Sequence, residues 1–219
     1  NFQLRKNNLL PFNCFLSNAI DMKMIIVGAT GTLGKKVADA FAQKHEVIRI
    51  GHTRGDFQVD ITDESSIKKM FDQIGPFDAL ISTTGKGPFA KIQQMTGDNM
   101  KKGLLDKLLG QINLVLIGQH YINPSGSFSL TSGILADHPV AAGAALSTIN
   151  GGLNSFVVAA AAELSNHVRI NAISPNVVED SPAYFDSFPG ETPVSMNKVV
   201  KAFEKSVLGI ITGQVIKVY

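Results

Sequence analysis

The loop from Gly28 to Gly34 has the residue types and spacing that point most directly to chemistry. It reads Gly-Ala-Thr-Gly-Thr-Leu-Gly, follows an apolar run at 24–27 and is followed by a helical pattern. Glycine permits positive φ and close approach of phosphate oxygens to backbone N–H groups, and a helix N-terminus attracts anions. The loop therefore predicts a diphosphate site contacted by Gly28, Thr30, Gly31, Thr32, Leu33 and Gly34. A tight strand-to-helix turn that binds no ligand is the alternative.

Two further residues are expected at the carboxyl ends of strands, where open parallel sheets bind their ligands. Asp60 directly follows a short apolar run, so its carboxylate could accept a hydrogen bond from a purine. Because Asp-x-Thr is also an ordinary helix N-cap signal, a capping role is equally open. Pro175 fixes the loop that follows the apolar segment 169–173.

Apolar runs and helical patterns alternate along the chain and predict the elements that position these residues. Strands are expected at 24–27, 47–50, 57–59, 79–82, 126–130, 169–173 and 214–218, and helices at 33–44, 64–73, 98–120, 140–165 and 196–208. This alternation predicts an α/β fold with a single doubly wound parallel sheet of about seven strands and helices on both faces. Residues 24–219 are expected to form one domain.

Composition excludes several functional classes. The net charge is +2 and the lysines are scattered, so no nucleic-acid partner is expected. Cys14 is the only cysteine, which argues against disulfides and cysteine-bound metals and favours a cytoplasmic location. The five histidines lack metal-ligand spacing, so we expect solvated or capping histidines and no metal.

Residues 1–23 fall outside the alternating pattern. They are too short and too polar to span a bilayer and lack a small-residue cleavage site, so we expect an N-terminal extension or a non-native remnant and no membrane association. Elsewhere, the stretch 141–162 has no charged face, and 98–120 carries three glycines. The helices at 98–120 and 140–165 could therefore form a homodimer or homotetramer interface; burial within one subunit is the alternative.

Several segments resemble, in order and spacing, motifs of the short-chain dehydrogenase/reductase family. The glycine loop resembles the family's cofactor turn, and Asp60-Ile61 resembles the strand end that receives the adenine amino group. Ser82-Thr83-Thr84-Gly85 occupies the place of Asn-Asn-Ala-Gly. The resemblance therefore implies that Ile61, Thr83, Thr84 and Gly85 also contact a dinucleotide.

The later segments carry the resemblance to the end of the chain. The segment 127–133 is similar to the strand that ends in the catalytic serine, here Ser132. The segment 171–175 resembles the Asn-x-x-x-Pro-Gly stretch that contacts the nicotinamide, which implies contacts by Pro175, Val177 and Val178. The segment 212–215 is similar to the last strand. The resemblance spans 24–219 and implies a Rossmann-type domain.

The end of the second strand indicates which dinucleotide is preferred. A carboxylate there accepts hydrogen bonds from the ribose of NAD, whereas cations favour the 2′-phosphate of NADP. The sequence offers His52, Thr53 and Arg54, with no carboxylate before Asp56. We therefore predict that NADP(H) is preferred over NAD(H). An exposed loop position for Arg54, without a role, is the alternative.

The catalytic pair of the resembling family is missing. That family uses Tyr-x-x-x-Lys on the helix after the serine, where the lysine lowers the tyrosine pKa and the phenol protonates the carbonyl. Leu146 and Asn150 occupy these places, and residues 139–168 contain neither tyrosine nor lysine. Asn150 remains an expected cofactor contact.

A lysine on another helix could replace the missing cation. The family's helix before the serine strand carries Asn-x-x-Gly, and the matching stretch here is Lys107-Leu-Leu-Gly. If Lys107 points into the pocket, it could act as an acid or stabilise a developing oxyanion; a surface position is the alternative. Tyr184 lies in the expected substrate loop at 179–193 and is a weaker candidate.

Two functions follow from the sequence. The first is an NADP(H)-dependent oxidoreductase that acts on a small carbonyl or hydroxyl substrate through Ser132 and Lys107. The second is a catalytically inactive dinucleotide-binding sensor or regulatory module. Fold alone does not choose between them.

Overall fold

The first strand, β1 (Lys23–Val27), is buried on both of its faces. Met24 and Ile26 pack against one helix layer, and Ile25 and Val27 pack against the other; all four are buried. Successive side chains of a strand point to opposite faces, so a strand that is apolar throughout fits a sheet covered on both sides.

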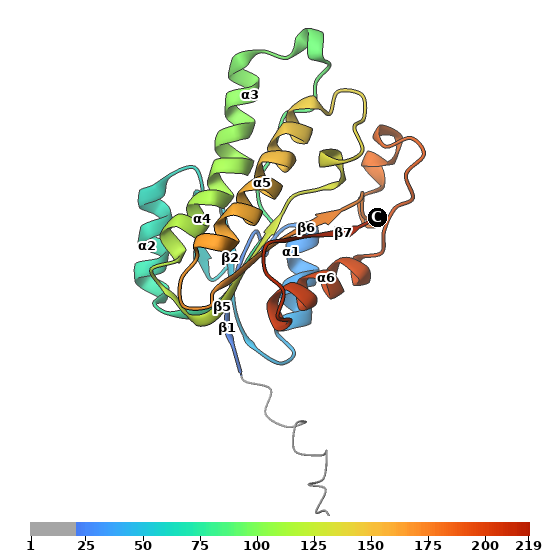
Figure 1. Ribbon diagram of the computed structural model, residues 1–219. Helices are drawn as coiled ribbons and strands as arrows, with labels where there is room; N and C mark the ends of the chain where they lie inside the picture. Colours follow the sequence, from blue (N-terminus) through green and yellow to red (C-terminus); the bar gives the residue numbers. More distant parts are fainter. Residues whose placement is uncertain (1–20) are drawn as a thin grey trace, which may run out of the picture.

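The computed structural model describes residues 21–219 (Figure 1). The strands are β1 (Lys23–Val27), β2 (Glu46–Gly51), β3 (Phe57–Gln58), β4 (Phe77–Ser82), β5 (Ile122–Thr131), β6 (Arg169–Pro175) and β7 (Gln214–Val218). The longer helices are α1 (Thr32–Phe41), α2 (Glu64–Ile74), α3 (Gly97–Gly103), the π-helical segment η3 (Leu104–Leu109), α4 (Gly110–Gly118), α5 (Ala144–Glu163) and α6 (Met196–Leu208). Short 3₁₀ turns lie at Ile92–Gln94, Ile134–Ala136 and Pro182–Ser187.

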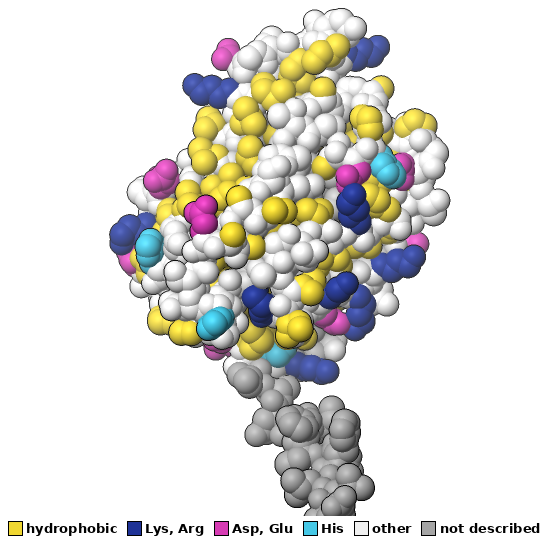
Figure 2. All heavy atoms as spheres, in the orientation of Figure 1, with side chains coloured by type: hydrophobic (Ala, Val, Ile, Leu, Met, Phe, Trp, Pro, Cys, Tyr) yellow, Lys and Arg dark blue, Asp and Glu magenta, His cyan; other side chains and the backbone are white. Residues whose placement is uncertain are grey.

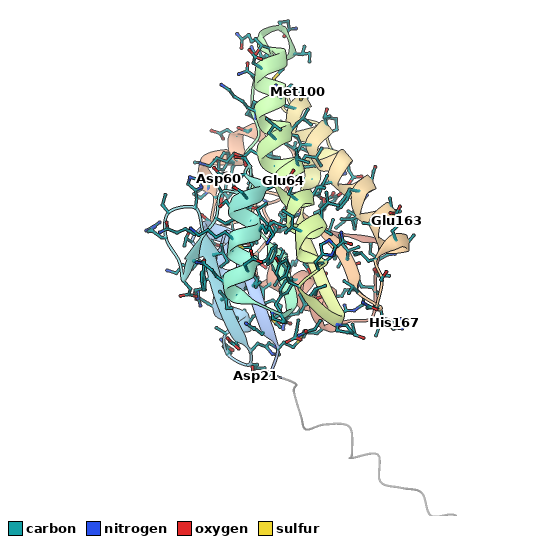
Figure 3. The ribbon with its side chains drawn as sticks, turned by 90° about the vertical axis from the view of Figure 1, so that its left-hand side faces the viewer. Asp21, Asp60, Glu64, Met100, Glu163 and His167 are labelled. Carbon is teal, nitrogen blue, oxygen red and sulfur yellow. The ribbon has the colours of Figure 1, made fainter. Side chains whose placement is uncertain are left out.

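The seven strands form one parallel sheet in the order β3-β2-β1-β4-β5-β6-β7. Helices α1 and α6 cover one face, and α2, α4 and α5 cover the other (Figure 1). The chain reverses its direction of winding between β1 and β4, so their carboxyl ends border the crevice where such sheets bind ligands. Figure 3 shows Asp60 at this end of the molecule and Asp21 at the opposite end.

The predicted fold class and all seven strands are confirmed, with differences at element boundaries. The fifth strand begins at Ile122 instead of residue 126. The helix expected at 140–165 begins only at Ala144, because Ala142 has a positive φ of 64° and Gly143 N donates to Val140 O in a turn. The expected extension lies outside the described residues up to Ile20, as does Cys14; Lys23 already belongs to β1.

The helix expected at 98–120 is continuous but changes its winding along its length. It runs as α3, η3 and α4, and Gly110 N donates to Leu105 O, a bond that spans five residues. Such π segments are rare and are frequently found at functional sites. The three glycines of this stretch give close contacts inside the subunit: added Cβ atoms would lie 2.9 Å from Ile149 Cδ1 at Gly103, 2.8 Å from Ile61 Cδ1 at Gly110 and 3.0 Å from Phe71 Cζ at Gly118.

Among the described residues, only α5 is long and apolar enough to cross a membrane, judged by length and composition. One face of it, with Ile149, Leu153 and Val157, is completely buried against the sheet layer. A core-facing helix of an α/β domain meets the same criteria, and we interpret α5 as such a helix.

Candidate functional site

The glycine loop is hydrogen-bonded to the end of β2 on one side and faces open space on the other. Gly28 has a φ of +88°, and the N–H groups of Gly28 and Ala29 donate to Ile50 O at 2.9 and 3.0 Å, which fixes the loop to the end of β2. Gly31 is the N-cap of α1 and supplies no capping side chain, so the first N–H groups of the helix remain available to a ligand. A Cβ at Gly31 would meet only Gly28 O, at 3.4 Å, so this side of the loop faces open space.

A cavity of about 420 Å³ lies beside this loop at the β1–β4 crevice. It is lined by the predicted residues Gly28, Thr30, Gly31, His52, Asp60, Ile61, Thr83, Thr84 and Gly85. The backbone N and Oγ1 of Thr62 donate to Asp60 Oδ1 at 2.9 and 2.7 Å, and these bonds lower the pKa of Asp60. Asp60 is therefore a charged acceptor at the cavity wall, which suits an adenine amino group. Loop, helix end and acceptor together fit a dinucleotide.

Other predicted cofactor residues lie outside this cavity. Gly34 is buried beneath the loop, where a Cβ would approach Gly28 O to 2.1 Å. Thr32 is exposed in the first turn of α1, and Thr53 and Arg54 lie on the exposed bend between β2 and β3. Of the residues predicted to favour NADP, only His52 lines the cavity.

A second cavity of about 730 Å³ adjoins the first through Gly85 and Lys86, which line both. The predicted residues Leu33, Gly85, Lys107, Ser132, Asn150, Pro175, Val177 and Val178 line it. Apolar side chains supply much of the remaining wall, among them Phe89, Ile134, Leu135, Leu146 and Phe188. Tyr184 also lines the cavity, although this side chain is 61% exposed overall.

Lys107 projects from η3 into the second cavity and does not occupy a surface position. Its Nζ donates to Ser132 O at 3.1 Å, and burial of the ammonium group lowers its pKa from 10.5 to about 8. Gly85 makes this placement possible: it has a φ of +101°, and a Cβ there would lie 2.6 Å from Lys107 Cα. Any side chain at position 85 would therefore collide with the backbone of η3, so the chain after β4 can approach η3 this closely only with a glycine at this position.

Gln111 holds the Lys107 turn against the end of β5, and sequence reasoning missed this residue. Its Nε2 donates to Thr131 O at 3.0 Å and Lys107 O at 3.3 Å, and its Oε1 accepts from Thr131 N at 2.9 Å. The side chain is completely buried. A glutamine four positions after Lys107, in a run where only Asn113 is also polar, was the available signal.

Asn150 and Lys107 bind neighbouring carbonyl groups of the Ser132–Gly133 backbone. Asn150 Nδ2 donates to Gly133 O at 3.3 Å. Ser132 and Asn150 are both buried, and neither Ser132 Oγ nor Asn150 Oδ1 has a hydrogen-bond partner among the described residues. Because buried polar atoms in native proteins are nearly always satisfied, we expect a partner at these two atoms that the described residues do not supply. One turn earlier on α5, Leu146 also lines the cavity, so α5 contributes apolar surface and an amide here.

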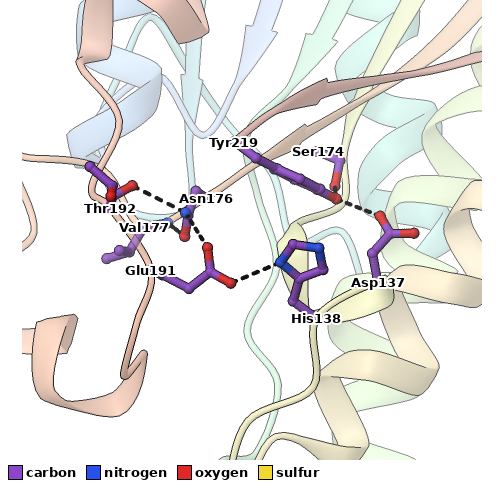
Figure 4. Close-up of polar contacts among 8 residues, drawn as sticks. All are labelled: Asp137, His138, Ser174, Asn176, Val177, Glu191, Thr192 and Tyr219. Carbon is purple, nitrogen blue, oxygen red and sulfur yellow. Dashed lines mark hydrogen bonds and ion pairs between the residues drawn. The ribbon is translucent and has the colours of Figure 1, made fainter.

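A polar network at the far wall fixes the loops around the cavity (Figure 4). His138 Nδ1 lies 2.8 Å from Glu191 Oε1, and Glu191 Oε2 accepts from Asn176 Nδ2 at 2.9 Å. Tyr219 donates to Asp137 Oδ2 at 2.5 Å, and burial raises the pKa of Tyr219 to about 12, so it stays protonated. Sequence reasoning missed this pairing of His138, because 53 residues separate it from Glu191.

Comparison with known proteins identifies the fold family. The family profile described as enoyl-(acyl carrier protein) reductase, a profile of short-chain dehydrogenases and reductases, matches residues 20–198. The chain belongs to the short-chain dehydrogenase/reductase family. Members of this family bind a nicotinamide dinucleotide, which agrees with the glycine loop and the adjoining cavity.

Among solved structures, the short-chain dehydrogenase/reductase chain is similar to the protein lin1944 from Listeria innocua, with 44% identity, a TM-score of 0.89 and coverage of 90% of this chain and 100% of that one. It is also similar to a small-chain dehydrogenase in complex with NADPH, with 27% identity, a TM-score of 0.80 and coverage of 89% and 95%. Among curated protein sequences, none matches this chain significantly.

Proposed function

We propose that this protein is an NADP(H)-dependent oxidoreductase that acts on a small carbonyl or hydroxyl substrate through a rebuilt proton relay. One observation carries the proposal: the Lys107 ammonium, the Ser132 hydroxyl and the Asn150 amide meet at the Ser132–Gly133 backbone, beside a dinucleotide cavity. The unpartnered Ser132 Oγ and Asn150 Oδ1 support a ligand at this point.

The chemistry follows from these groups. A nicotinamide dinucleotide held by the glycine loop and Asp60 would supply a hydride to the carbonyl carbon of the substrate. Ser132 Oγ donates a hydrogen bond to the substrate oxygen, and the Lys107 ammonium stabilises the negative charge that develops there. Lys107 then gives its proton to this oxygen and is reprotonated from solvent. A lysine whose pKa is about 8 suits this exchange, since a general acid works best near the operating pH.

The proposed preference for NADP(H) rests on the end of β2. His52 lines the first cavity, and Arg54 lies two residues further along an exposed bend, within a stretch that has no carboxylate before Asp56. A cationic bend of this kind attracts the 2′-phosphate and offers no acceptor to the ribose hydroxyls of NAD. The NADPH complex of the similar small-chain dehydrogenase supports the same preference.

One experiment on the unmodified protein tests both parts. NADPH and NADH are titrated by fluorescence, and NADPH oxidation is then followed with a panel of small aldehydes, ketones and oxo acids. We expect tighter binding of NADPH and turnover of at least one carbonyl compound. Equal affinity for the two cofactors would contradict the preference. Binding of NADPH without any turnover would instead favour the sensor function.

We also propose a homodimer or homotetramer formed through the α3–α4 and α5 helices, in a cytoplasmic protein. Leu105, Leu109, Leu116 and Val158 are between 39% and 56% exposed on these helices, and Figure 2 shows apolar side chains along this face. Exposed apolar patches of this kind mark association sites.

The interface prediction is tested by molar mass in solution. Leu116→Glu and Val158→Glu together should reduce the mass to that of one chain, because a charge on each helix cannot be buried between subunits. Leu208→Glu is the matched control, since Leu208 is equally exposed but lies on α6. A monomeric mass for the unmodified protein would overturn the proposal.

A further inference from the structure

The second cavity combines positive charge with apolar surface. Lys86 and Lys107 are the charged residues that line it, and no Asp or Glu within the described range does so. Two acidic side chains on neighbouring segments are engaged elsewhere. Asp106 lines the first cavity and accepts a bond from Lys86 N, and Glu191 is held by His138 and Asn176. The charge balance therefore favours an anionic ligand.

Within residues 21–219, no carboxylate forms an ion pair with the Lys107 ammonium. Among these residues its hydrogen bond goes to the neutral carbonyl of Ser132, at 3.1 Å. An ammonium has three N–H donors, so two remain for a ligand. A buried charge is costly unless it is paired, and here burial already lowers the lysine pKa to about 8. A carboxylate in the cavity would supply the missing partner.

The remaining lining of the second cavity is largely apolar, which indicates the chemistry of the uncharged part of the ligand. Ile134 and Leu135 are buried at one side, and Leu146, Phe89 and Phe188 add apolar surface. Leu146 stands where the family's tyrosine would place a hydroxyl, and it packs so closely on Gly87 that a Cβ there would meet its Cδ2 at 2.4 Å. An apolar substituent fits such a wall better than a sugar or a second charge.

We propose that the substrate is an α-keto acid with an apolar side chain, whose carboxylate and carbonyl oxygens both bind Lys107. This rests on the proposed oxidoreductase function. The two oxygens sit on adjacent carbons, so one ammonium group can contact both while Ser132 Oγ contacts the carbonyl oxygen. In the reduction, a hydride that NADPH would supply adds to the carbonyl carbon, the C=O electron pair moves to oxygen, and that oxygen takes a proton from Lys107, which gives an α-hydroxy acid and NADP⁺.

Binding to the protein saturated with NADP⁺ tests the proposal without turnover. Phenylpyruvate and its methyl ester differ in one charge and are compared by isothermal titration calorimetry. The unmodified protein should bind the acid about 10- to 100-fold more tightly, the range of a charged hydrogen bond. Lys107→Gln should reduce this ratio to about one. Lys101→Gln, which removes an exposed lysine of α3 that does not line the cavity, should keep the ratio.

A second readout uses only the unmodified protein. At pH 8 the lysine is about half protonated, so binding of a carboxylate should draw up to about 0.5 proton from buffer, and the uncharged ester should draw clearly less. Calorimetry in buffers of different ionisation enthalpy measures this uptake. Equal affinity and equal proton uptake for acid and ester would overturn the α-keto acid, even if neutral ketones were reduced. Preferred binding of the acid without NADPH oxidation of any carbonyl would instead overturn the oxidoreductase function and leave the anion site in place.

Discussion

Lys107→Met is expected to make the protein more stable while it lowers carbonyl turnover by about 10²–10⁴-fold, the usual contribution of one general acid. Burial lowers the pKa of Lys107 from 10.5 to about 8, so the folded protein holds this proton less tightly than the unfolded chain does. That difference corresponds to a free-energy cost of folding of about 3 kcal/mol at neutral pH. Methionine fills a similar volume without a charge and removes this cost.

The folding cost of the Lys107 ammonium depends on pH. The cost is complete below pH 8, declines between pH 8 and 10.5, where the folded protein has lost this proton and the unfolded chain still holds it, and is absent above pH 10.5. The stability gain of Lys107→Met should follow this course in chemical denaturation. The kcat/KM for carbonyl reduction should be constant below pH 8 and fall about tenfold per pH unit above it, because the ammonium is the active form.

Two further variants separate the role of Lys107 from the general effect of removing a lysine and from the effect of its charge. Lys101→Met removes an exposed lysine of α3, in the same helical run, and should change neither stability by more than about 0.5 kcal/mol nor turnover. Lys107→Arg keeps the charge but holds its proton far more tightly, so turnover should stay low at every pH if Lys107 is the proton donor. Unchanged turnover in Lys107→Met would exclude Lys107 as the proton donor.

Two alanine substitutions in the glycine loop should have opposite effects. A Cβ at Gly34 would lie 2.1 Å from Gly28 O and 2.5 Å from Thr83 Oγ1, so Gly34→Ala must displace backbone. We expect it to destabilise the fold by more than about 3 kcal/mol, as overpacking against rigid atoms does. Gly31→Ala meets only Gly28 O at 3.4 Å and should fold normally, but its methyl group enters the space beside the helix N-terminus where a diphosphate would bind.

Thermal unfolding and NADPH titration separate the two variants. Gly31→Ala should keep the unfolding temperature of the unmodified protein and bind NADPH at least about tenfold more weakly, because a methyl group would block close approach of phosphate to the loop N–H groups. Gly34→Ala should unfold at a lower temperature even without cofactor. Normal NADPH affinity in Gly31→Ala would place the phosphates elsewhere.

The fold was predictable because its signals are local. The runs at β1 and β4 are mostly apolar, and a strand buried on both faces leaves few other arrangements. The glycine loop and Asp60 were also recognisable, since phosphate approach and strand-end acceptors depend on residues close together in sequence. The structure gathers most of these residues into two adjoining cavities, while their roles in binding stay predictions.

The parts that escaped prediction depend on distant contacts or on irregular backbone. The His138–Glu191 pair joins two loops that the sequence separates by 53 residues. The direction of the Lys107 side chain was open because helical periodicity assumes 3.6 residues per turn, and η3 departs from it. For Arg54 the sequence suggested a contact that the structure does not show. Its charge predicted a cofactor contact, whereas the side chain lies on an exposed bend outside the first cavity.

The wide turn at η3 also bears on how such a protein could have changed its activity. Removing one residue from this segment would restore ordinary helical winding and alter by about 100° the angle between the side chains before it and those after it. Gln111 holds the following turn against β5, so the turn that carries Lys107 would be the part that rotates. The Lys107 side chain would then point in another direction. The glycine loop and the strand order would be untouched. A catalyst and a cofactor-binding protein without chemistry could thus be a single-residue deletion apart in evolution.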